Sequence, residues 1–251
     1  MARVHDLIAA IRTAHPTDPF FHNFEASLRT DPLKRSYYAA YERAFSCLDD
    51  TSWTNLRSKA VAHSHEQRPK RVKAPLFDQL NDAFAYRWLV NRGFSQVTIL
   101  PEDHRATQKS PDISFCGCGR ELACDVKTLN VSNNELDRRC APDYNISDGT
   151  PANPKYYDWS TTFQKLHPTF FKKIDEAVAK GTEQIRTRCK NGLVFILVHS
   201  DDYASTFYPE HRVCIASHLR RFQDIAVVVK FGVVGQRRIE HIDSLLVAHA
   251  A

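Results

Sequence analysis

Two carboxylates and a lysine lie within one short segment near the middle of the chain. Asp112 follows a proline, and Asp125 and Lys127 stand two positions apart farther along. The residues Cys116–Gly119 form a turn signal between them, so the segment is expected to be a β-hairpin. Alternation along the second strand puts Asp125 and Lys127 on the same face. Paired carboxylates hold Mg²⁺ or Mn²⁺, and a nearby ammonium can orient or deprotonate a water molecule and neutralise developing negative charge.

This segment resembles the signature of the PD-(D/E)xK nuclease superfamily, with Pro111-Asp112 as the first part and Asp125-Val126-Lys127 as the second. The second part is the only Asp/Glu-x-Lys tripeptide in the chain. The resemblance implies a metal-dependent nuclease that hydrolyses phosphodiester bonds, with DNA favoured over RNA and with Mg²⁺ or Mn²⁺ as cofactor. Asp112, Asp125 and the Val126 carbonyl would hold the metal. Lys127 would position or activate the attacking water and stabilise charge on the phosphate.

A helix and then a short strand over 97–100 are expected ahead of the hairpin. Pro75 suits the first turn of the helix and Gly93 suits its C-terminal cap. Its apolar residues recur at helical spacing: Phe77, Leu80, Phe84 and Trp88. The family's helix often carries an acidic residue that reaches the metal directly or through water, and Asp82 stands at that place. Asp78, one turn earlier on the same face, is the second candidate.

Alternating helices and apolar strands are expected after the hairpin. A long helix over 170–189 leads to a nearly all-apolar strand over 192–198, and a helix over 209–222 leads to a similar strand over 224–230. With the hairpin, these elements predict an α/β fold with a restriction-endonuclease-like mixed central sheet flanked by helices. Within the long helix lies Gly181, which allows close approach. The resemblance places Gln184 against the substrate or the attacking water.

The chain divides into an N-terminal helical module over 1–66, a basic linker over 67–74 and a nuclease-like core over 75–251. Four helical pieces are expected in the module: 4–14, 20–28, 33–48 and 53–63. The aromatic residues of the module have the spacing of helix packing. An irregular insertion interrupts the core at about 129–160 and is rich in turn-forming residues, which is typical of functional loops.

Basic residues in the linker and in the insertion are candidate nucleic-acid contacts. They are Arg68, Lys70, Arg71 and Lys73 in the linker and Arg138 and Arg139 in the insertion. Arginine and lysine contact phosphates without reading sequence, so these residues would position a strand near the hairpin. A solvated connector and a packed or partner-binding loop are the alternatives for the two segments.

Composition agrees with a folded protein that binds a polyanion. The chain has 251 residues and a formal net charge of +5. No apolar run approaches the ~20 residues that a membrane helix needs. The N-terminus lacks the pattern of a signal peptide, and seven cysteines without that signal favour free thiols and the cytoplasm. By alternation, Cys124 is expected to face the core.

Simpler interpretations compete with the enzyme. An aspartate after proline is often a turn residue, and a strand that ends in Asp-x-Lys can carry a solvated ion pair of little energetic weight. A catalytically silent nucleic-acid-binding or protein-assembly module on the same fold is the main alternative. A partner-binding immunity or scaffold protein would depend on the aromatic N-terminal helices. A homodimer would suit the cutting of two antiparallel strands.

Overall fold

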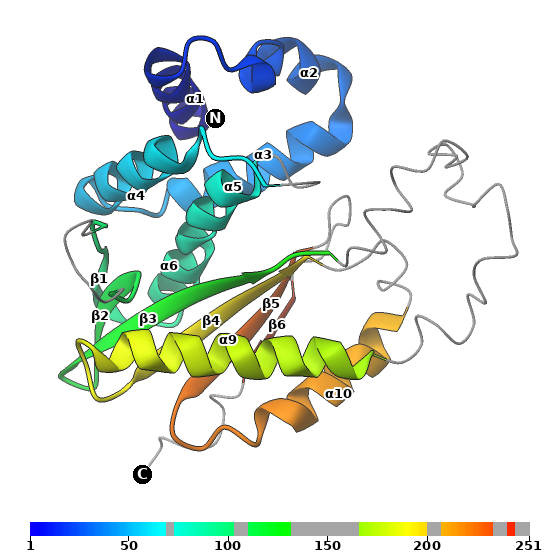
Figure 1. Ribbon diagram of the computed structural model, residues 1–251. Coiled ribbons are helices and arrows are strands. Elements are labelled where there is room, and N and C mark those ends of the chain that lie inside the picture. Colours follow the sequence, from blue (N-terminus) through cyan, green and yellow to red (C-terminus); the bar gives the residue numbers. More distant parts are fainter. Residues whose placement is uncertain (69–72, 103–109, 132–165, 200–206, 233–239, 244–251) are drawn as a thin grey trace, which may run out of the picture. The chain divides into compact units, whose positions relative to one another are not determined.

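The computed structural model describes residues 1–68, 73–102, 110–131, 166–199, 207–232 and 240–243 (Figure 1). The protein is of the mixed α/β class, with helices and a mixed sheet. Its chain forms two compact units. The first unit comprises 1–127 and 179–195, and the second comprises 128–178 and 196–251.

The first unit begins with helices, as its sequence predicts. They are α1 (Ala2–Ala14), the 3₁₀ helix η1 (Pro19–Phe21), α2 (Phe24–Thr30), α3 (Pro32–Phe45) and α4 (Asp50–His63). Three of these helices start at capping aspartates: Asp18 for η1, Asp31 for α3 and Asp49 for α4. Asp31 accepts hydrogen bonds from two backbone N–H groups at the start of α3, where Pro32 occupies the first turn. Asp49 accepts one from Ser52 at 2.6 Å at the start of α4.

Aromatic side chains hold these helices together. Phe24, Tyr41 and Phe45 are among the largest fully buried side chains of the described residues. The ring of Phe24 meets that of Tyr38 edge to face at a centroid distance of 4.8 Å. The expectation that the aromatic residues of this segment serve helix packing is therefore confirmed. One expected helix differs, because 20–28 is divided between η1 and α2.

The helix expected ahead of the hairpin is also divided. It consists of α5 (Ala74–Leu80) and α6 (Asp82–Asn91), which meet at Asn81. The buried side chain of Asn81 accepts a hydrogen bond from the Tyr41 hydroxyl at 3.0 Å, a tertiary contact that local spacing does not reveal. The division places Asp82 in the first turn of α6, where the helix dipole favours a negative charge. Gly93, at φ +82°, ends α6 as expected.

The strands of the first unit follow in the order β1-β2-β3-β4. Their bounds are β1 (Ser95–Ile99), β2 (Ile113–Gly117), β3 (Arg120–Leu129) and β4 (Gly192–His199), the last shared with the second unit. β2 and β3 pair antiparallel, and Cys118 and Gly119 connect them with φ values of 49° and 72°. Positive φ at both positions is the geometry of a two-residue type I′ turn. The predicted hairpin is confirmed.

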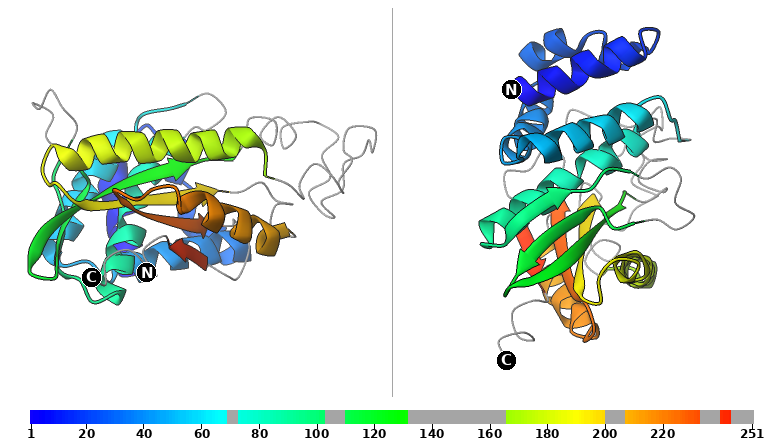
Figure 2. Two further views of the ribbon diagram at one scale, coloured as in Figure 1. Left: turned by 90° about the horizontal axis from the view of Figure 1, so that it is seen from below. Right: turned by 90° about the vertical axis from the view of Figure 1, so that its left-hand side faces the viewer.

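Helices cover the strands of the first unit closely. α4 and α6 both pack on β1, and Figure 2 gives two further views of these elements. The C-terminal part of α9 (Pro168–Arg186) approaches through Gly181. A Cβ added at Gly181 would lie 2.9 Å from Asp125 Oδ2 and 2.9 Å from Val194 Cγ2. Only glycine allows this approach without displacement, as the sequence predicts.

The second unit contains the end of β4, α10 (Tyr208–Leu219), β5 (Ala226–Gly232) and β6 (Glu240–Asp243), with strand order β4-β5-β6. β5 pairs antiparallel with β6, a strand that the sequence analysis does not predict. The centre of β5 is fully buried at Val227–Val229. Most of the expected irregular insertion, from 132 onward, lies outside the described residues.

The described residues bear on two expectations from composition, one about membrane-spanning helices and one about the cysteines. No helix found there combines the length and apolar character that crossing a membrane requires. The cysteines in those ranges are free, and Cys124 is fully buried, as alternation predicts. Cys140 lies outside them.

Candidate active site

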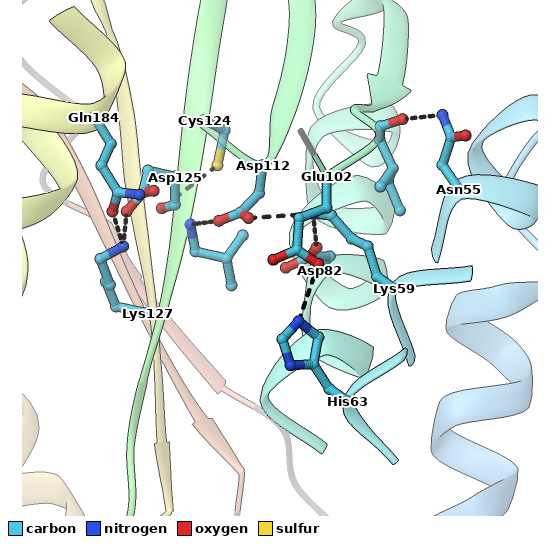
Figure 3. A network of polar contacts seen from close by, with 12 residues as sticks. Asn55, Lys59, His63, Asp82, Glu102, Asp112, Cys124, Asp125, Lys127 and Gln184 are labelled. Carbon is cyan, nitrogen blue, oxygen red and sulfur yellow. Dashed lines mark hydrogen bonds and ion pairs between the residues drawn. The ribbon is translucent and has the colours of Figure 1, made fainter. Parts of the chain in front are cut away.

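Five charged side chains of the first unit lie in two neighbouring groups beside the hairpin: Lys59 with Asp82 and Asp112, and Lys127 with Asp125 (Figure 3). Asp112 precedes β2, and Asp125 and Lys127 project from β3. Asp82 comes from the first turn of α6, and Lys59 comes from α4. The fold thus brings together all four residues of the predicted carboxylate and lysine set and adds a second lysine.

The hairpin register holds Asp112 in place. The Asp112 backbone N–H donates to the Cys124 carbonyl at 3.1 Å, which continues the ladder one residue beyond β2. Its carboxylate Oδ2 accepts the backbone N–H of Val126 at 2.8 Å. Its other oxygen, Oδ1, lies 3.3 Å from Lys59 Nζ. Val126 therefore joins the site through an amide that orients a carboxylate.

Asp125 has an unusual environment for a carboxylate. Its side chain is fully buried, and its Oδ2 forms an ion pair with Lys127 Nζ at 2.5 Å. Its other oxygen, Oδ1, accepts no hydrogen bond from the residues that the structure describes. Lys127 also donates to the Gln184 side-chain oxygen, so Gln184 positions the lysine from α9 (Figure 3). A buried carboxylate normally has its oxygens satisfied, which makes Asp125 an exception that needs an explanation.

Burial and mutual repulsion perturb the acids. Burial, followed by the negative charge of Asp112, raises the pKa of Asp125 to about 7. The same two causes raise the pKa of Asp82 to about 7. Burial would lower the pKa of Lys59, but Asp82 and Asp112 outweigh it and raise that pKa above its usual value. Three carboxylates face two ammonium groups, so the fully ionised cluster has a surplus of negative charge.

The donor set and the surplus charge suit a hard divalent cation. Mg²⁺ and Mn²⁺ prefer carboxylate oxygens, and a cation beside Asp125 would supply the partner that Oδ1 lacks among the described residues. No group of three or more His, Cys, Asp or Glu side chains among the described residues is arranged to hold a metal by itself. Asp82 instead pairs with Lys59 Nζ at 3.1 Å. Asp112 shares this ammonium at 3.3 Å, and Asp125 pairs with Lys127, so each of the three carboxylates already has one lysine partner.

Lys59 is not among the site residues predicted from the sequence. Its neighbours on the buried stripe of α4 are Ser52, Leu56 and Ala60, and the lysine is itself buried. A lysine in the inward stripe of a helix is a signal that the sequence contains, since lysine is rarely buried unless paired. Its partners on α6 and at β2 are set by tertiary contacts, so the signal alone does not name them.

The choice between the two helix acids is settled by position. Asp78 pairs with Arg68, whose Nη1 lies 3.1 Å from Asp78 Oδ2. Asp82 shares Lys59 with Asp112 and is almost fully buried. Asp82 is accordingly the helix acid of the site.

The predicted nucleic-acid contacts divide into three groups. Arg68 is exposed, so a phosphate could reach it. Lys73 is buried and forms an ion pair with Asp18. The expectation that Lys73 contacts phosphate does not hold, because its ammonium is used inside the fold. Lys70, Arg71, Arg138 and Arg139 lie outside the described residues.

Comparisons with known proteins found no match. No protein-family model, curated protein or solved structure matches this chain. The resemblance to PD-(D/E)xK nucleases rests on Asp112, Asp125 and Lys127, together with the helix that precedes them.

Proposed function

We propose that this protein is a metal-dependent nuclease that hydrolyses phosphodiester bonds, with DNA as the favoured substrate. The observation that carries the proposal is Asp125, a fully buried carboxylate that pairs with Lys127 through Oδ2 and whose Oδ1 accepts no hydrogen bond among the described residues. An unsatisfied buried polar group costs about 1–3 kcal/mol, and more when it is charged. A site that binds a cation there explains why such an arrangement is kept.

The residues have separate roles in this proposal. Asp112 and Asp125 hold Mg²⁺ or Mn²⁺, which supplies Lewis-acid polarisation of the phosphate and charge neutralisation when bound. The Val126 N–H fixes the orientation of Asp112 at 2.8 Å. Lys127, held between Asp125 and Gln184, orients the attacking water and offsets negative charge that develops on the phosphate.

Cleavage assays test the proposal. Plasmid DNA, linear DNA and single-stranded RNA are incubated with the parent protein in Mg²⁺, Mn²⁺ or EDTA. We expect cleavage with either metal and none in EDTA. Asp125→Asn keeps the size of the side chain but removes its charge, and we expect cleavage to fall by about two to four orders of magnitude.

Asp78→Asn is the matched control, since Asp78 lies on α5, the helix before that of Asp82, and pairs with Arg68. We expect it to cleave like the parent. Equal cleavage by the parent and Asp125→Asn would show that the proposed function is wrong.

One observation favours the alternative of a catalytically silent module. Lys59 already forms ion pairs with both Asp82 and Asp112, which is what a cluster that only supports the fold would do. That alternative predicts nucleic-acid binding that survives Asp112→Asn and no binding of divalent metal. Fluorescence anisotropy with labelled DNA and calorimetry with Mn²⁺ distinguish the two functions. Sedimentation in the same buffers measures whether the chain is a homodimer.

A further inference from the structure

Lys59 is held in the acidic cluster by two carboxylates. Its Nζ lies 3.1 Å from Asp82 Oδ2 and 3.3 Å from Asp112 Oδ1 (Figure 3). Its side chain is 6% exposed. An ammonium so deeply buried is fixed in position, so it acts as a permanent charge next to any group bound at Asp112.

Contacts between α4 and β1 set the position of Lys59. Asn55 on α4 donates to the Ile99 carbonyl at 2.8 Å, and the Ile99 N–H donates to Ser52 Oγ at 3.0 Å. Both backbone groups of the last β1 residue are thus bound by the same helix. The next backbone amide donates to the Asp112 carbonyl at 2.8 Å, so α4 is tied to the strand end beside Asp112.

Asp112 has room for one more cation. Its Oδ1 is used by Lys59 and its Oδ2 by the Val126 N–H. A carboxylate has about four lone-pair sites, so roughly two remain for a metal ion. A carboxylate that bridges two cations is the central feature of two-metal phosphodiesterase sites, whose ions lie about 3.5–4 Å apart. In this protein one of the two cations on Asp112 is an ammonium.

Counting charges leads to the same arrangement. Asp82, Asp112 and Asp125 with Lys59 and Lys127 sum to one net negative charge when ionised. One divalent ion turns this into one positive charge, which matches the single negative charge of a phosphodiester. A second divalent ion would leave a surplus of positive charge.

We propose that Lys59 is a built-in cation that takes the second cation position of this site, so that the protein binds a single divalent ion at Asp112 and Asp125. This inference rests on the proposed function. Lys59 acts through Asp112 and is a positioning residue. The N-terminal helices are then part of the site, because α4 supplies a charge that the hairpin lacks.

The test is the number of Mn²⁺ ions bound per chain, measured on the metal-free full chain by calorimetry and by electron paramagnetic resonance. We expect one ion for the parent. We expect two ions for Lys59→Met, because Asp82 and Asp112 are then free to hold a second ion. Two ions in the parent, or one ion in a folded Lys59→Met, would overturn the inference.

A second pair of variants covers the case in which Lys59→Met does not fold. The double variant Lys59→Met/Asp82→Asn removes the lysine together with the more buried of its two acids, while Asp112 keeps the Val126 N–H, and Asp82→Asn alone keeps the lysine. We expect both to bind one ion, and the double variant to cleave DNA at least about 10-fold more slowly than Asp82→Asn. Equal cleavage would mean that Lys59 only neutralises Asp82, which overturns the inference.

Failure of the proposed function gives a different result. If the parent binds no Mn²⁺ and cleaves no substrate, the nuclease itself is excluded, and the inference falls with it. If the parent binds one ion that Asp125→Asn loses, the proposed site is supported, and the Lys59 variants alone decide the inference.

Discussion

Among the described residues of the first unit, two buried lysines form ion pairs, and they differ in the number of acids that face them. Lys73 pairs with Asp18 and also donates to the Ser64 carbonyl at 2.6 Å. Lys59 instead faces two carboxylates, with Asp125 as a third acid nearby. The first cluster has equal numbers of positive and negative charges, whereas the second has more acids than its lysines can neutralise.

The pKa values of the acids in the two clusters shift in opposite directions. Burial would raise the pKa of Asp18, but the hydrogen bond from Lys73 prevails, and the pKa is lowered. Burial and Asp112 together raise the pKa of Asp82 and of Asp125 to about 7. A balanced pair favours ionised acids and supports the fold. The unbalanced cluster keeps ionisation costly until another cation arrives, which is a property of a binding site.

The largest effects are expected when one lysine of each cluster, Lys127 or Lys73, is exchanged for methionine. The exchange should separate a lysine that serves catalysis from one that serves the fold. We expect Lys127→Met to lower DNA cleavage by about two to four orders of magnitude. Its fold should survive, because Asp125 can take up a proton when its pKa is already raised to about 7. We expect Lys73→Met to lose about 1–3 kcal/mol of stability, since it leaves half-buried Asp18 and the Ser64 carbonyl without their ammonium partner. Cleavage rates and thermal unfolding are measured on both. Loss of activity in folded Lys73→Met would contradict the comparison.

Filling the space beside Asp125 should damage both fold and activity. In Gly181→Ala, the new Cβ would lie 2.9 Å from Asp125 Oδ2 and from Val194 Cγ2. We expect a loss of about 1–3 kcal/mol in denaturant unfolding and slower cleavage, because overpacking moves the carboxylate. Gly232→Ala is the control, since its nearest neighbour would be at 3.7 Å. If Gly181→Ala matched this control in both measurements, the close approach would not hold Asp125.

The metal-free protein should lose stability as the pH rises. The folded pKa values of Asp82 and Asp125 are about 7, above the ordinary value of about 3.9 for unfolded aspartate. The folded state therefore binds more protons between these values, and stability falls as pH increases from about 4 to 7. Melting temperatures without metal measure this slope. Added Mn²⁺ should raise the melting temperature more at pH 8 than at pH 5, because it binds ionised carboxylates.

Asp18 provides the contrast for the pH experiment. Its pKa is lowered in the folded state, so its contribution is present above the unfolded pKa and is lost as the pH falls. We expect Asp18→Asn to remove stability at neutral pH but leave the decline between pH 4 and 7. Asp125→Asn should reduce that decline. The same pH slope in both variants would argue against an unbalanced cluster at Asp125.

The smallest effect is expected at the surface. Arg68 is exposed and pairs with Asp78, an interaction worth about 0–1 kcal/mol. We expect Arg68→Ala to leave the free energy of unfolding nearly unchanged. The slope of the logarithm of DNA affinity against the logarithm of salt concentration should fall by about 1, as expected for one lost phosphate contact. Arg188→Ala is the matched control, since Arg188 pairs with exposed Glu121. Equal salt slopes for the two variants would show that Arg68 does not contact a phosphate of the bound DNA.

Local chemistry in the sequence determined the hairpin and the acids on it. The turn needs residues that adopt positive φ, and Cys118-Gly119 supplies them between two alternating strands. Once that turn forms, the antiparallel register places Asp112 beside Cys124 and brings Asp125 within reach. The position of Gly181 likewise requires a residue without a side chain, because α9 approaches this strand closely there.

The tertiary structure decided the rest of the cluster. Lys59 belongs to a different helix from Asp82, and only the packing of α4 on β1 brings the two side chains to 3.1 Å. The interruption at Asn81 and the burial of Lys73 depend on Tyr41 and Asp18, which lie far away in the chain. Residue types and periodicity report local conformation and a preferred face. The partner that a buried charge meets there is set by the whole fold, because several distant segments must pack before that charge is enclosed.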